Sequence, residues 1–134
     1  MERKELKKFN GDLFFEVQRK AANSYIFTNW VGIQTLETIL LGTNQVLDML
    51  RKEPSTGILN SNRELIGPWD DGALYMGNKW VMELNTLGVI HFAHVLAPGI
   101  YGQRSFEKFF QLAQPYLQIE VFNSNEEAES WLLS

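Results

Sequence analysis

Two histidines lie three residues apart in an apolar stretch of the chain. His91 and His94 fall within GVIHFAHVLA, the run from Gly88 to Ala97. Imidazole nitrogens are common zinc ligands, so the pair is a candidate metal site. The run is apolar at both alternating positions, however, which predicts a strand buried on both faces. Residues three apart in a strand point to opposite faces, so we expect packed or partly exposed histidines and no metal site.

A pair of neighbouring acids, Asp70 and Asp71, is the second candidate for chemistry. Two carboxyl groups can share general acid and base roles, but adjacent residues on a helix do not face each other. Acids at a helix start instead accept hydrogen bonds from open backbone N–H groups and meet the positive end of the helix dipole. The pair therefore predicts the start of a helix.

The remaining catalytic and cofactor motifs are missing from the sequence. The chain has no cysteine, which excludes disulfides, thiolate zinc sites and cysteine nucleophiles. Neither of the two glycine-rich nucleotide-binding patterns follows a predicted strand, and no G-x-S-x-G elbow is present. We therefore predict a non-enzymatic protein with no catalytic residues and no cofactor.

Composition limits the partners and the location of the protein. The 134 residues include 12 Lys and Arg against 16 Asp and Glu, a formal net charge of −4, which disfavours binding to nucleic acid. The opening MERKELKKFNGD lacks the apolar core of a signal peptide, and no apolar run is long enough to span a bilayer. We expect a cytoplasmic protein with no membrane span.

Hydrophobic periodicity predicts alternating strands and helices. Period-two patterns and short apolar runs predict five strands, at 12–18, 24–30, 56–60, 88–97 and 117–122. Patterns with three- and four-residue spacing predict helices at 35–52, 70–84, 106–115 and 124–133. The order ββαβαβαβα predicts one α/β domain over 12–134, with a mixed, mostly parallel five-stranded sheet. Residues 1–11 are expected to form a charged, flexible N-terminal segment.

An aromatic stripe runs along the second predicted helix. Trp69, Met76 and Trp80 share one face of this helix, with Tyr75 beside them. One interpretation is packing in the core, because aromatic side chains bury large apolar areas. The other is that the four residues form an exposed surface for a partner or line an apolar pocket.

Several stretches together resemble a known group of proteins. These are NWVG at the end of the second strand, Trp80, AHVLAP followed by YG, and VFNSNEEAESWL, in which Ser124 and Glu127 form a capping box. The chain resembles the small bacterial SpoIIAA-like proteins, which are grouped with STAS domains and with the lipid-binding CRAL-TRIO fold. The resemblance implies a regulatory or protein-interaction module in signalling, with a protein partner or a second copy of the chain. The alternative it implies is a carrier or sensor of an apolar small molecule or lipid, in a pocket lined by Phe92, Phe106 and Phe109.

The resemblance also points to one candidate site of modification. Sporulation antagonists of this group carry a phosphorylatable serine after the third strand, beside an aspartate and at the start of the second helix. The corresponding stretch is LNSNREL, so Ser61 is the candidate phosphoacceptor. Here Asn60 stands near the position of the aspartate, and the helix is predicted to begin only at Asp70. The other interpretation of this stretch is a turn formed by Asn-Ser-Asn.

Overall fold

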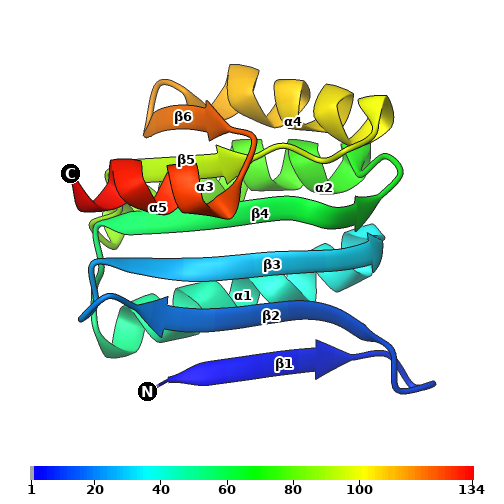
Figure 1. Cartoon of the computed structure of the whole chain (residues 1–134), viewed down its shortest axis with the longest axis horizontal. Helices are drawn as coiled ribbons and strands as arrows, with labels where there is room; N and C mark the ends of the chain where they lie inside the picture. The colour runs from blue at the N-terminus through cyan, green and yellow to red at the C-terminus, as the bar shows by residue number, and fades with distance from the viewer. Residues whose placement is uncertain (1) are drawn as a thin grey trace.

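The chain forms one six-stranded sheet with helices on both faces, as the computed structural model of residues 2–134 shows (Figure 1). The strands stand in the sheet in chain order, from β1 to β6; the β1–β2 and β2–β3 pairs are antiparallel and the later pairs are parallel. Their bounds are β1 Arg3–Lys7, β2 Leu13–Lys20, β3 Tyr25–Ile33, β4 Gly57–Ile66, β5 His91–Val95 and β6 Gln118–Phe122. The helices are α1 Leu36–Lys52, α2 Asp70–Tyr75, the π-helical η1 Met76–Trp80, α3 Val81–Thr86, α4 Ile100–Ala113 and α5 Asn125–Leu133.

The predicted α/β class with a mostly parallel sheet is confirmed, and the sheet has one strand more than predicted. The additional strand is β1, which lies in the segment that was expected to be flexible. It pairs along β2 in a register that runs from Arg3 opposite Gln18 to Leu6 opposite Phe15. Charged side chains obscured it in the sequence, yet they suit a strand at the edge of a sheet.

The two faces of the sheet bury separate apolar cores. The larger core lies between the sheet and the helices α1 to α4, and the smaller one lies beneath α5, which packs on β4, β5 and β6 (Figure 1). The rings of Phe92, Phe106 and Phe109 are buried in the larger core, with centroids 5.3 Å and 6.1 Å from one ring to the next. These rings pack on one another, at the place where a lipid carrier would need an open pocket.

The predicted helix at 70–84 is present and continuous through α2, η1 and α3 to Thr86. Its glycines, which weaken an isolated helix, allow the neighbouring helices to approach closely. A Cβ atom at Gly72 would lie 2.1 Å from Ile39 Cδ1 in α1, and one at Gly77 would lie 2.7 Å from Leu112 Cβ in α4. The glycines therefore fix how this helix packs between its two neighbours.

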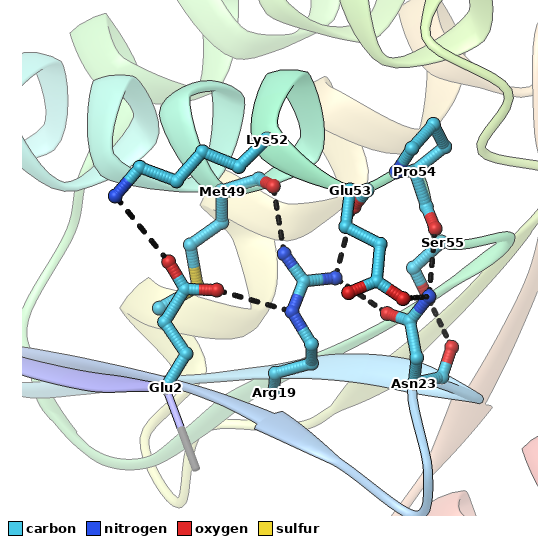
Figure 2. Close-up of polar contacts among 8 residues, drawn as sticks. All are labelled: Glu2, Arg19, Asn23, Met49, Lys52, Glu53, Pro54 and Ser55. Carbon is cyan, nitrogen blue, oxygen red and sulfur yellow. Dashed lines mark hydrogen bonds and ion pairs between the residues drawn. The ribbon is translucent and has the colours of Figure 1, made fainter.

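A single arginine ties β2 to the end of α1 (Figure 2). Arg19 of β2 donates from Nη2 to the carbonyl of Met49 at 2.7 Å and from Nη1 to that of Glu53 at 2.9 Å. Its other contacts are Glu2, at 3.1 Å from Nε, and Asn23 in the β2–β3 turn. The network also includes Lys52, Pro54 and Ser55. Arg19 thus adds a charged donor to the carbonyl of Met49, which also accepts the backbone N–H of Glu53 at 3.1 Å, and supplies a donor to the carbonyl of the C-cap residue Glu53.

Candidate functional site

The opposite end of the sheet gathers the starts of four helices. β3 leads into α1, β4 into α2, β5 into α4 and β6 into α5, so the carboxyl ends of four parallel strands meet these helix starts along one edge (Figure 1). Open α/β sheets bind their ligands at this edge, because the loops there are free to vary while the strands position them. This edge is therefore the first place to look for a site.

Five exposed apolar side chains lie on the strand and helix ends along this edge. Ile33, Leu36, Ile66, Ile100 and Tyr101 come from β3, α1, β4 and α4 and are 41 to 62% exposed. Ile33 and Ile66 are register partners on neighbouring strands, so they lie side by side. We call these five residues the apolar rim.

The rim follows from the unequal lengths of the strands. β4 pairs with β5 only from Gly57 to Ser61, so its second half extends beyond β5 and pairs with β3 alone. α4 begins against this extension, where a Cβ atom at Gly102 would lie 3.2 Å from Leu65 Cδ2. Leu65 points into the core, and Ile66 therefore points away from it. The sequence analysis did not identify the rim, although apolar residues beside a turn glycine, in VGI and LIGP, were an available signal.

A cleft of about 200 Å³ opens beside the rim, between the starts of α1 and α2. We call it the outer cleft; it is lined by Gln34, Thr35, Leu36, Ile39, Pro68, Trp69, Asp70, Asp71 and Gly72. On the α1 side, a capping box fixes its wall, because Thr35 and Thr38 each accept a hydrogen bond from the other's backbone N–H.

Asp70 fixes the α2 side of the outer cleft. It accepts from Lys108 Nζ at 2.8 Å and from Ser105 Oγ at 2.5 Å, and these two hydrogen bonds lower the pKa of its carboxyl group. Asp70 is the first residue of α2, and its neighbour Trp69 is the N-cap, whose backbone N–H is bonded by Ser105. The prediction that a helix starts at the acidic pair is thus confirmed, and both acids lie in its first turn, but the expected capping role is wrong, because the N-cap is Trp69 and the helix start has no side-chain capping hydrogen bond. Asp70 anchors α4 to α2.

Ser61 lies inside β4, so the structure corrects its placement in a loop. Its side chain is fully buried, and its hydroxyl accepts a hydrogen bond from the backbone N–H of Arg63 at 3.4 Å. A kinase cannot reach this hydroxyl in the folded chain, because the residue is covered on the face that α5 shares with the sheet. Asn-Ser-Asn does not form a turn either, since β4 continues to Ile66.

The aromatic stripe faces the core, which corrects its interpretation as an exposed partner surface. Trp69, Met76 and Trp80 are buried, and Tyr75 is half-buried. Trp80 also donates from Nε1 to the carbonyl of Thr43 in α1 at 3.2 Å. The periodicity located the apolar face correctly, but α1 and α4 cover that face on either side.

A polar network, which the sequence analysis did not foresee, crosses the larger core. Thr28 Oγ1 and Trp30 Nε1 both donate to Asn60 Oδ1, at 2.8 and 2.9 Å. The amide nitrogen of Asn60 lies 3.2 Å from His94 Nδ1, and the His94 ring stacks on Phe106 with centroids 3.8 Å apart. Burial lowers the pKa of His94 to about 3, so the ring is neutral near pH 7.

His91 and His94 point to opposite faces of the sheet, as predicted. The His91 ring contacts Trp131 of α5 with centroids 5.5 Å apart, on the face opposite to His94. Within residues 2–134, no group of three or more His, Cys, Asp or Glu side chains is placed to hold a metal ion.

Three solved structures are similar to this chain in fold. The unphosphorylated anti-sigma factor antagonist SpoIIAA superposes with a TM-score of 0.64 at 13% identity, over 89% of this chain and 96% of SpoIIAA. The chain has a SpoIIAA-like fold. The phosphorylated form of SpoIIAA, described as a Bacillus cell fate determinant, gives a TM-score of 0.57 at 15% identity over 88% of this chain and 98% of that chain. An uncharacterised DUF3478 protein with a SpoIIAA-like fold from Shewanella loihica gives 0.58 at 16% identity over 89% and 94%.

The similarity to known proteins is a similarity of fold alone. No family model matches the sequence, and no curated protein matches it either. At identities of 13 to 16%, the SpoIIAA-like fold carries no residue roles from one chain to the other. None of the helices in residues 2–134 has the length and apolar character needed to cross a membrane.

Proposed function

We propose that this chain is a non-enzymatic regulatory module of the STAS type, which binds a protein partner through the apolar rim. The observation that supports the proposal is the exposure of Ile33, Leu36, Ile66, Ile100 and Tyr101 along one edge of the sheet. Apolar side chains gathered on one surface mark sites of protein interaction. The likeness to SpoIIAA, an anti-sigma factor antagonist, also favours a regulatory role. A location in the bacterial cytoplasm is part of the same proposal.

The rim is held rigidly, which suits a binding surface. Ile33 and Ile66 lie on paired strands, and Leu36 follows the capping box that begins α1. Ile100 and Tyr101 lie on the first turn of α4, which is tied to α2 through Ser105 and Asp70. A surface that is ordered before binding loses little conformational entropy when a partner arrives, so its apolar area contributes more fully to affinity.

The experiment compares a charge placed in the rim with the same charge placed outside it. Ile66→Asp changes the rim, and Ile90→Asp is the matched control. Ile66 and Ile90 are 60% and 52% exposed, and Ile90 precedes β5 at the amino-terminal end of the parallel strands. Circular dichroism and thermal unfolding establish that both variants are folded before binding is measured.

Partners are first captured from a lysate of the native cell with the tagged wild-type chain, identified by mass spectrometry, and purified. Calorimetry with the purified partner is expected to show at least a tenfold loss of affinity for Ile66→Asp, about 1.4 kcal/mol or more, and no loss for Ile90→Asp. If the partner is a second copy of the chain, sedimentation is expected to show a dimer that only Ile66→Asp dissociates. Equal affinity of both variants would reject the rim as the binding surface.

A further inference from the structure

The tip of the β1–β2 hairpin presents a phenylalanine to solvent. Phe9 is fully exposed, although the turn that carries it is ordered by hydrogen bonds. The backbone N–H of Gly11 donates to the carbonyl of Lys8 at 2.9 Å, and the N–H of Lys8 donates to the carbonyl of Asp12 at 2.8 Å. The side chain of Asn10 also accepts from the N–H of Asp12 at 3.0 Å. An aromatic ring held outward on an ordered turn is suited to anchor a complex, because such rings carry much of the binding energy at interfaces.

This tip lies at the same edge of the sheet as the outer cleft. Lys7 at the end of β1 pairs with Leu13 at the start of β2, and Phe15 of β2 pairs with Trp30 near the end of β3. The β1–β2 turn therefore stands beside the carboxyl end of β3, from which the chain enters α1. In Figure 1 the loop between β1 and β2 reaches past the ends of β3 and β4. Phe9 is thus placed to contact another molecule that meets this edge.

The outer cleft has the size and the lining to hold an aromatic ring. Its volume is about 200 Å³, and an apolar cavity of about 150 Å³ is sufficient for a benzene molecule. The apolar residues in its lining are Leu36, Ile39, Pro68 and Trp69. The chain therefore carries both a projecting ring and a recess that fits one, on the same edge of the sheet.

The charges beside these two features are complementary. Lys7 and Lys8 precede Phe9 and are exposed, and neither forms an ion pair within residues 2–134. On the side of the cleft, Glu37 lies in the first turn of α1 and Asp71 in the first turn of α2. Both carboxylates are exposed and likewise form no ion pair in the described part of the chain. Opposite charges on two surfaces favour their association and fix their register.

Two copies related by a two-fold axis can exchange this contact, because each copy then presents the same surface to the other. We propose that the chain forms a symmetric dimer in which Phe9 of each copy enters the outer cleft of the other. The two lysines before Phe9 then face the two carboxylates beside the cleft. The inference deepens the proposed function by naming a second copy as the partner, and it rests on that function for the claim that this edge is an interaction surface.

The first test measures the dissociation constant of the dimer by sedimentation of the full chain over a range of concentrations. Phe9→Ser should weaken the dimer at least about tenfold, because it removes the ring that fills the cleft. The matched control is Tyr116→Ser, at a residue 41% exposed between α4 and β6, which should dimerise as the wild type does. By NMR, the methyl signals of Leu36 in the cleft should shift with concentration in the wild type and stay constant in Phe9→Ser.

The second test looks for a gain of binding, which damage to the fold cannot imitate. Lys7→Glu/Lys8→Glu and Glu37→Lys/Asp71→Lys each place like charges at both contacts of a dimer, so each variant alone should be monomeric. Mixed in equal amounts, the two variants should form a heterodimer, because opposite charges then meet at both contacts. Thermal unfolding establishes that each variant is folded before mixing.

The inference is overturned if the wild type stays monomeric at millimolar concentration, if Phe9→Ser leaves the dimer intact, or if the mixture contains no heterodimer. A monomeric wild type that binds vesicles containing phosphatidylserine through Phe9 would also overturn it, and would assign the tip to a lipid surface. The proposed function fails or stands by a separate result. A monomeric chain that loses a lysate partner only in Ile66→Asp would overturn the dimer and keep the proposed function. A dimer that Phe9→Ser dissociates and Ile66→Asp leaves unchanged would support the inference and reject the rim.

Discussion

The buried His94 predicts a specific loss of stability in acid. Its pKa is lowered to about 3 in the folded chain from an ordinary 6.5, so the unfolded chain binds a proton that the native chain does not. Stability therefore falls as the pH falls below 6.5. Between about pH 7.5 and about pH 4.5 the free energy of unfolding is expected to fall by about 3 kcal/mol. Over about two of these pH units the unfolded chain holds one proton more than the native chain, and each unit then costs about 1.4 kcal/mol.

The assay is urea unfolding at both pH values for the wild type and for His94→Gln, which does not titrate and keeps an acceptor for Asn60. The variant should lose about 3 kcal/mol less than the wild type over this interval. His91→Gln, on the opposite face of β5, is the control and should behave as the wild type does. Asp70 does not obscure the result, because a lowered carboxyl pKa gives stability that is lost only as the pH falls through and below 3.8. Equal pH dependence in the wild type and His94→Gln would show that His94 is not held neutral by burial.

Three further changes test the packing, with the free energy of unfolding measured from the midpoint and slope of urea unfolding. Arg19→Met should lower this free energy by about 3 kcal/mol, because it leaves the carbonyls of Met49 and Glu53 without a charged donor. The control Arg51→Met, on the surface, should lower it by less than about 1 kcal/mol, and equal losses in both variants would refute the role of Arg19 shown in Figure 2. Gly77→Ala should destabilise the chain by about 1 kcal/mol, since the added Cβ would lie 2.7 Å from Leu112 Cβ, and a gain in stability would show that helix propensity outweighs the contact. Ala22→Gly should stabilise by up to about 1 kcal/mol, because Ala22 has a φ of 52°, and a loss would mean that this turn is not strained.

Local sequence patterns predicted most of the helices and strands, but they did not predict which elements pack against one another. Three- and four-residue spacing predicted a helix at 70–84, which the structure extends to Thr86, but the sequence pattern of a face that packs in the core is as apolar as that of a face that binds a partner. Whether Trp80 is covered depends on α1 and α4, which come from distant parts of the chain. The sequence therefore predicted the stripe and left its burial open.

The stretch from Asn60 to Asn62 shows the same limit. Asn-Ser-Asn has a strong local preference for turns, and β4 was accordingly expected to end at Asn60. The strand continues because Asn60 is bonded by Thr28, Trp30 and His94, all of them more than 29 residues away. Such long-range partners override a local preference and leave no mark in the local pattern, so the burial of Ser61 inside β4 could not be predicted from the sequence.

The central claim, that the apolar rim binds a protein partner, is tested most directly by the affinity of the purified partner for Ile66→Asp and Ile90→Asp. If the rim binds the partner, we expect at least a tenfold lower affinity for Ile66→Asp and an unchanged affinity for Ile90→Asp, with both variants folded. Wild-type affinity in Ile66→Asp, or an equal loss in both variants, would contradict it.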